Sequence, residues 1–171
     1  MSDTFITVIV VMVVAVLMFV FPLMATANQN DSITQTAVQT MVSEFANTVA
    51  KEGKVTESNY NEFVQKLYAT GNSYRVELEA QILDDNPAKK GDNKDVIGEN
   101  IYYSVYTNTI ENTVNTGNEY KLKQGDYFIV KVTNTNVTMG TQVKNFFYSI
   151  IGKDTIAIEA SANALVTTTV K

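Results

Sequence analysis

The feature that most constrains this chain is an uncharged, apolar stretch at residues 5–25. It consists of Val, Ile, Leu, Met, Phe and Ala, and only Thr7 and Pro22 interrupt it. At about 1.5 Å of rise per residue, a helix over this stretch is roughly 30 Å long, which matches the hydrocarbon core of a bilayer. Such a surface is unstable in water. We therefore expect it to lie in lipid, to be cleaved off, or to pack against copies of itself.

Cleavage as a secretory leader is one interpretation, because Ala25 and Ala27 form the small-x-small pattern of a leader's end. Two observations favour a retained helix instead. Residues 1–4 contain no Lys or Arg, and their one charged side chain is the acidic Asp3. The apolar stretch also exceeds the usual leader core of about 7 to 15 residues. We expect residues 1–27 to form a transmembrane and assembly helix.

Composition narrows the function of the rest of the chain. The protein has no cysteine and no histidine, which removes thiol nucleophiles, the commonest general base and the commonest zinc ligand. A net charge of -5 disfavours nucleic acid as a partner. About 120 residues follow the apolar helix and its continuation, which is enough for one domain. We expect a protein that is not an enzyme and that has no cofactor or metal.

The helical pattern continues beyond Pro22, with an amphipathic segment at residues 28–53. Apolar side chains recur at helical spacing and predict one buried face: Ile33, Ala37, Val38, Met41, Val42, Phe45 and Val49. Gly53 follows Glu52 as a helix C-terminal signal. We predict one helix from near Thr4 to Glu52, kinked but not broken at Pro22.

Residues 54–171 predict an α+β head domain. A helix begins after the N-cap Thr56 and ends at Gly71, and a strand with one wet face follows at residues 74–82. The polar residues 84–95 predict an exposed loop. The fold class is therefore α+β, with short helices and an antiparallel sheet behind a long N-terminal helix.

The second half of the head has further elements. We predict a short helix after Tyr106, although residues 101–114 are also rich in strand formers. Residues 127–133 alternate as a strand, residues 143–151 carry a helical apolar stripe, and residues 156–170 form a last strand.

Two groups of acidic residues are candidates for chemistry, and each has a simpler explanation. The loop at 84–95 offers oxygen ligands but lacks the spacing of a calcium loop and contains three lysines. Glu77 and Glu79 share a face of their strand without apolar neighbours that would raise a pKa. We expect a solvated loop and a solvated strand face.

Taken together, the N-terminal apolar helix, Pro22, the amphipathic continuation and the small head resemble the type IV pilin superfamily. The closer resemblance is to TadE-like pilins and pseudopilins of clostridial type. It is carried by short stretches: Ser43-Glu44-Phe45, Val55-Thr56-Glu57-Ser58-Asn59-Tyr60, Thr70-Gly71-Asn72-Ser73-Tyr74, Gln124-Gly125-Asp126-Tyr127 and Ile158-Glu159-Ala160-Ser161-Ala162. The resemblance implies an inner-membrane protein that enters a filament by bundling its N-terminal helices.

Under this resemblance, Asp3 replaces the glutamate that usually stands near a mature pilin's N-terminus, and it takes over that residue's electrostatic role in assembly. No basic leader ending in Gly precedes the helix, so we expect either prior removal or insertion without such processing. The expected assembly interface comprises Asp3, Phe5, Val8, Val11, Met12, Ala15, Phe19, Pro22, Ile33, Val38, Met41 and Phe45.

The expected function is therefore that of a structural subunit, either a pilin or a minor pilin, of an extracellular type IV or Tad-like filament. Its expected partners are copies of itself, an inner-membrane assembly machinery and, before assembly, membrane lipid. We expect it in the cell membrane first and in a cell-surface filament afterwards. The alternative is a single-pass, membrane-anchored extracellular binding module that does not polymerise. No Lys or Arg precedes Lys51, so charge gives no orientation.

Overall fold

The computed structural model describes residues 2–84, 102–136, 142, 145 and 158–170. The chain divides into two compact units, of which the first combines Met1–Thr36 with Val137–Ile158. The second combines Ala37–Asn136 with Glu159–Lys171, and we call its described residues the head. The fold is α+β, as the sequence predicts.

Helix α1 spans Ser2–Glu52 without interruption, which confirms the predicted long helix and its passage through Pro22. The helix ends where expected, because Gly53 takes a positive φ of 68°. A Cβ atom at this glycine would lie 2.6 Å from the backbone oxygen of Thr168. Gly53 is therefore required both by its backbone conformation and by the close approach of the C-terminal segment.

The head contains a four-stranded antiparallel sheet in the order β3-β2-β5-β6. Its strands are β2 (Tyr74–Leu83), β3 (Tyr102–Tyr106), β5 (Tyr127–Asn134) and β6 (Glu159–Leu165). The predicted alternation holds: Leu78 and Ala80 are buried on one face, while Glu77 is exposed on the other. Two short strands, β1 (Lys54–Val55) and β4 (Tyr120–Lys121), form a second antiparallel pair.

Two shorter helices complete the head. Helix α2 (Glu57–Tyr68) begins at Thr56, whose side chain accepts from the Asn59 backbone N–H, while the Asn59 side chain accepts in return from the Thr56 N–H. This reciprocal capping box confirms the predicted N-cap. Helix α3 (Thr107–Asn115) confirms the helix predicted after Tyr106 and buries Ile110 and Val114.

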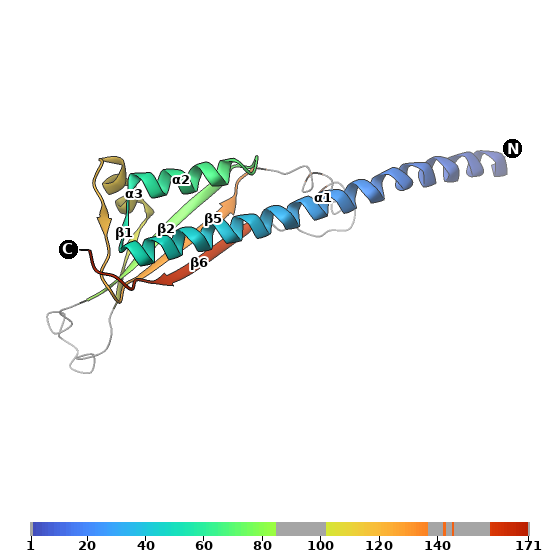
Figure 1. Cartoon of the computed structure of the whole chain (residues 1–171). Helices are drawn as coiled ribbons and strands as arrows, with labels where there is room; N and C mark the ends of the chain where they lie inside the picture. The colour runs from blue at the N-terminus through green and yellow to red at the C-terminus, as the bar shows by residue number, and fades with distance from the viewer. Residues whose placement is uncertain (1, 85–101, 137–141, 143–144, 146–157, 171) are drawn as a thin grey trace, which may run out of the picture. The chain divides into compact units, whose positions relative to one another are not determined.

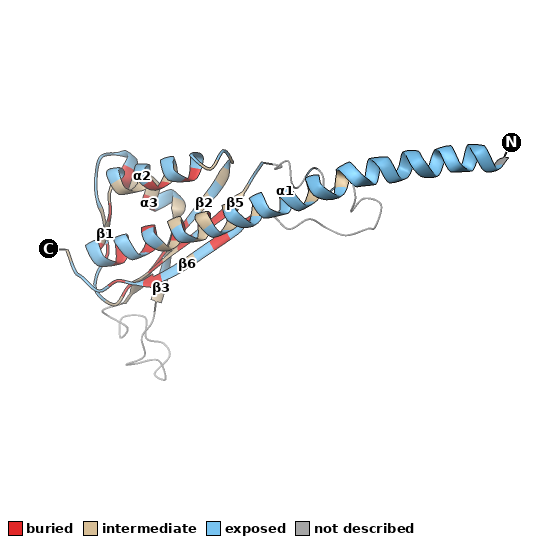
Figure 2. Cartoon of the chain, turned by 45° about the vertical axis from the view of Figure 1, so that its right-hand side comes forward, coloured by how far each residue is buried: buried red, intermediate tan, exposed pale blue. Residues whose placement is uncertain are grey.

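The core lies between one face of the sheet and helices α1 and α2. Figure 1 shows the C-terminal part of α1 running across β5 and β6, and Figure 2 shows that its buried positions face the sheet. The Phe45 ring stacks on Phe63 of α2, with centroids 4.3 Å apart, and meets the edge of Phe128 of β5 at 5.9 Å. Side chains from α1 thus hold α2 and the sheet together.

Three predictions concern the remaining segments. The last strand is shorter than predicted, because β6 ends at Leu165 and the next N–H groups bond elsewhere: that of Val166 to the Asp126 oxygen, and that of Thr167 to the Ala50 oxygen. The predicted helix at 143–151 lies outside the described residues apart from Asn145, which is helical. The predicted loop at 84–95 lies outside them apart from Asp84.

Candidate assembly helix

The N-terminal part of α1 presents a continuous apolar surface. Its side chains are exposed around the whole helix circumference, from Phe5 at 69% to Phe19 at 80%. No residue in the most apolar part of α1 is buried in the isolated chain, and the helix is long and apolar enough to cross a membrane. Because water does not stabilise such a surface, this segment requires lipid or protein around it.

The hydroxyls of Thr7 and Thr26 in this part of α1 are satisfied by the helix itself. The Thr7 hydroxyl donates to the Asp3 backbone oxygen at 2.7 Å, and the Thr26 hydroxyl donates to the Pro22 oxygen at 3.0 Å. These internal bonds let both threonines enter an apolar environment without an unpaired hydroxyl. Pro22 has no N–H, so the carbonyl of Met18, four residues earlier, lacks its usual helical donor.

Most of the predicted interface residues are exposed in the single chain. This holds for Asp3, Phe5, Val8, Val11, Met12, Ala15, Phe19, Pro22 and Ile33. Each is therefore available to contact lipid or another copy, and its part in assembly remains a prediction.

Three predicted interface residues lie in the head, and two of them require a correction. Val38 is 0% exposed and Phe45 is 5% exposed, both in the core between α1 and the sheet. Both side chains are therefore covered by the chain's own core rather than presented as an open surface. Met41 is partly buried and packs against the same core. The apolar periodicity of residues 37–49 thus identifies the head's own core, because the buried face of α1 is occupied by the sheet.

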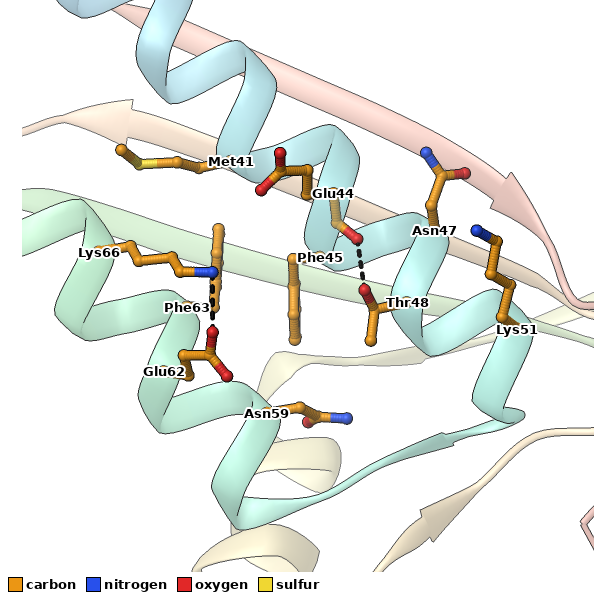
Figure 3. Close-up of a pocket in the computed structure, with 10 residues that line it drawn as sticks. All are labelled: Met41, Glu44, Phe45, Asn47, Thr48, Lys51, Asn59, Glu62, Phe63 and Lys66. Carbon is orange, nitrogen blue, oxygen red and sulfur yellow. Dashed lines mark hydrogen bonds and ion pairs between the residues drawn. The ribbon is translucent and has the colours of Figure 1, made fainter.

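The solvent-facing side of α1 in the head forms a groove with α2, with a volume of about 360 Å³. Figure 3 shows Phe45 and Phe63 side by side in it, with Glu44, Lys51, Glu62 and Lys66 around them. Lys66 and Glu62 form an ion pair at 2.8 Å. This hydrogen bond lowers the pKa of Glu62 and raises the pKa of Lys66. Both shifts favour the charged forms, whereas a general acid or base at neutral pH needs the opposite.

A second polar centre in the head was missed by the sequence analysis. The buried Asp126 carboxylate accepts hydrogen bonds from the backbone N–H of Leu83 at 2.9 Å and of Lys123 at 2.7 Å. It thereby joins the end of β2 to the turn before β5. The sequence analysis uses Gly125-Asp126 only within the Gln124-Gly125-Asp126-Tyr127 stretch, although an Asp next to a Gly is a known side-chain acceptor for nearby backbone groups in turns.

Two tyrosines in the head have raised pKa values. Burial, together with a hydrogen bond from its hydroxyl to Glu111, raises the pKa of Tyr60. Burial, with smaller effects of Tyr103 and Asp126, raises the pKa of Tyr120 to about 12. Both shifts keep the phenol neutral and indicate structural packing. Among the residues that the structure describes, no group of three or more acidic side chains is placed to hold a metal ion.

The long apolar helix is thus the feature of this chain with the clearest functional consequence. Comparisons with protein-family models, with curated proteins and with solved structures yield no match to this chain.

Proposed function

We propose that this chain is a non-enzymatic structural subunit, a pilin or minor pilin, of a type IV or Tad-like surface filament. In this proposal the subunit first resides in the cell membrane through α1. An inner-membrane assembly machinery then transfers it into a filament whose axis is a bundle of α1 helices. The single observation that carries the proposal is the exposure of apolar side chains around the whole circumference of α1 between Phe5 and Phe19.

The apolar segment and part of the head's core belong to the same continuous helix. Val42 and Val49 of α1 lie in that core, where both are 0% exposed. This continuity is compatible with a bundled filament and with a simple anchor.

Exchange of lipid for protein around an apolar helix is nearly neutral in free energy. Tight packing and polar anchors must therefore determine the register between copies. Asp3 is the one charged side chain of the described helix before residue 31, and a carboxylate in an apolar bundle needs a cationic partner. The chain has no Lys or Arg before Lys51, so in this proposal the cationic partner of Asp3 comes from another molecule.

The absence of histidine and cysteine from the whole sequence supports a structural over a catalytic role. A membrane anchor without polymerisation is the competing function. It accounts equally well for the length of the apolar stretch, which matches one bilayer crossing.

Electron microscopy of material sheared from the cell surface separates the two functions. We expect filaments that react with an antibody against the head and that contain the chain with its α1 segment intact by mass spectrometry. Cells lacking this chain serve as the control. Recovery of the chain in the membrane fraction alone, with no filaments in the sheared fraction, would refute the proposal in favour of the anchored module.

A further inference from the structure

Strand β2 is longer than the strand beside it, which leaves part of one edge of the sheet open. Residues Glu79 to Leu83 of β2 pair with β3, whereas on its other side β2 pairs with β5 along nearly its whole length, from Tyr74 to Gln81. At Thr107 the chain turns into α3 and leaves β2. Residues 74–77 therefore have no strand partner on the β3 side among the described residues.

The direction of the backbone groups at this edge follows from Leu78. Its N–H donates to the Thr107 hydroxyl at 2.8 Å, and its carbonyl accepts from the same hydroxyl at 3.1 Å. The Thr107 hydroxyl thus makes the two hydrogen bonds to Leu78 that the backbone of a further β3 residue would otherwise make. In an antiparallel ladder, alternate residues point their N–H and C=O groups to the same side. The N–H and C=O of Val76 consequently point to the open side of β2.

Two cavities lie on opposite faces of the sheet at this edge. The inner one, of about 170 Å³, is lined by Val64 and Leu67 of α2, by Val76 and by Glu111 of α3, among others. The outer one, of about 370 Å³, is lined by Glu77, Glu79, Tyr106 and Ile129 among others. An added strand alternates its side chains between the two faces, so it would place them in these two cavities in turn.

The outer cavity favours a positive side chain. Glu77 and Glu79 both line it, and Glu79 already accepts a hydrogen bond from the Ser104 hydroxyl at 2.6 Å. The lysine there, Lys131, forms an ion pair with Glu159 at 2.7 Å. Glu77 is the more exposed carboxylate of this cavity. Tyr106, which is 65% exposed, and Ile129 offer apolar surface for the aliphatic part of a long side chain. The inner cavity is lined by Val64, Leu67 and Val76, by three tyrosines and by Glu111, to which the Tyr60 hydroxyl is hydrogen-bonded. Its three aliphatic side chains offer contact to a small apolar group.

We propose that the open edge of β2 at residues 74–77 binds an extended segment of a partner protein, which adds as a short antiparallel strand. The segment places apolar side chains in the inner cavity and Lys or Arg side chains in the outer one. Affinity comes from backbone bonds to Val76, and selectivity comes mainly from charge complementarity with Glu77. This surface lies in the head and does not depend on whether the chain polymerises through α1.

Hydrogen exchange of the full-length, ¹⁵N-labelled chain in detergent micelles tests the open edge first. The Val76 amide should exchange much faster than the amides of Arg75 and Glu77, which point toward β5. An acetylated and amidated peptide of alternating Val and Lys, three of each, should then slow exchange at Val76. Slow exchange at Val76 before any peptide is added would overturn the proposal. Protection of the Val76 amide that increases with protein concentration would also overturn it, because it indicates pairing with a second copy.

Backbone methylation of the peptide provides a matched pair of probes. In an antiparallel addition, the peptide residues that bond to Val76 have side chains on the inner face, where the valines lie. Methylation of the valine amides should weaken binding by about tenfold or more, whereas methylation of the lysine amides should change it little. Equal binding of both methylated peptides, or no change at Val76 with about 1 mM unmodified peptide, would contradict the proposal.

Charge variants test the outer cavity separately. Glu77 is exposed, so the Glu77→Gln variant should fold normally and should bind the Val-Lys peptide about threefold more weakly. A peptide with Glu in place of Lys should bind the unmodified chain more weakly than the Val-Lys peptide. The control is Glu57→Gln, an exposed carboxylate on α2 that lines neither cavity, and it should leave binding unchanged. Insensitivity to Glu77→Gln and to peptide charge would refute the assigned selectivity.

Discussion

Replacement of Asp126 by alanine should destabilise the head more than the loss of any exposed carboxylate. Asp126 is 1% exposed and is the one buried charged side chain among the described residues. Its two oxygens accept from the N–H groups of Leu83 and Lys123, at 2.9 and 2.7 Å. Asp126→Ala removes both acceptors and leaves the two donors facing an apolar methyl group.

The magnitude follows from the two bonds. A hydrogen bond to a charged acceptor contributes about 1.5–3 kcal/mol, and an unpaired buried donor carries its full desolvation cost. Lys123 is exposed, so water can replace part of its bond, whereas Leu83 is half-buried. We expect Asp126→Ala to lower the free energy of unfolding by about 2–4 kcal/mol. Asp126→Asn keeps one acceptor oxygen, so its free energy of unfolding should lie between those of Asp126→Ala and the unmodified chain.

Guanidinium denaturation of the full-length chain in mild detergent measures this effect. Eight of the nine tyrosines lie in the head and none lies in α1, so near-ultraviolet circular dichroism in the tyrosine band reports mainly on the head. Glu159→Ala is the matched control, because its ion pair with Lys131 is solvent-exposed and is expected to contribute less than about 1 kcal/mol. Equal midpoints for Asp126→Ala and Glu159→Ala would refute the structural role of the Asp126 carboxylate.

Three further predictions concern a turn, one tyrosine and the helix terminus. Gly53→Ala should destabilise the head by at least about 1 kcal/mol, because a Cβ would lie 2.6 Å from the Thr168 oxygen at a positive φ; a denaturation midpoint equal to that of the unmodified chain would contradict this. Burial raises the pKa of Tyr120 to about 12. The folded state therefore holds this proton more tightly than the unfolded state, and the contribution of Tyr120 should be complete below pH 10 and disappear as the pH rises toward 12. Stability measured from pH 8 to 12 should fall less steeply in Tyr120→Phe, and identical slopes would contradict the shift. Asp3→Ala should reduce the amount of chain in sheared filaments while leaving membrane insertion intact, with Asp31→Ala as the same-helix control; normal filaments from Asp3→Ala would show that its carboxylate has no part in assembly.

Local sequence signals predict the elements of this fold well where the deciding interactions are close in sequence. The continuity of α1 follows from its apolar periodicity, and its end follows from Gly53. The Thr56 cap and the alternation of β2 likewise depend on residues within a few positions of one another.

The burial of Val38 and Phe45 shows what such local signals do not predict. Periodicity identifies an apolar face but does not identify what covers it, so a face that packs on the chain's own sheet resembles one that packs on a neighbour. The roles of Asp126 and Thr107 could not be predicted from local sequence for a related reason. Asp126 bonds to Leu83 and Thr107 bonds to Leu78, and these partners are brought together only by sheet pairing.

Photo-cross-linking from within the apolar part of α1 tests the central claim most directly. Benzoylphenylalanine replaces Phe19, which is 80% exposed, and the chain is irradiated in sheared surface material and, separately, dispersed in detergent. We predict dimers in the surface material, with the cross-linked peptide mapping to the α1 helix of another copy, and only monomers in detergent. Monomers alone in the surface material, or cross-links solely to lipid, would contradict assembly through α1.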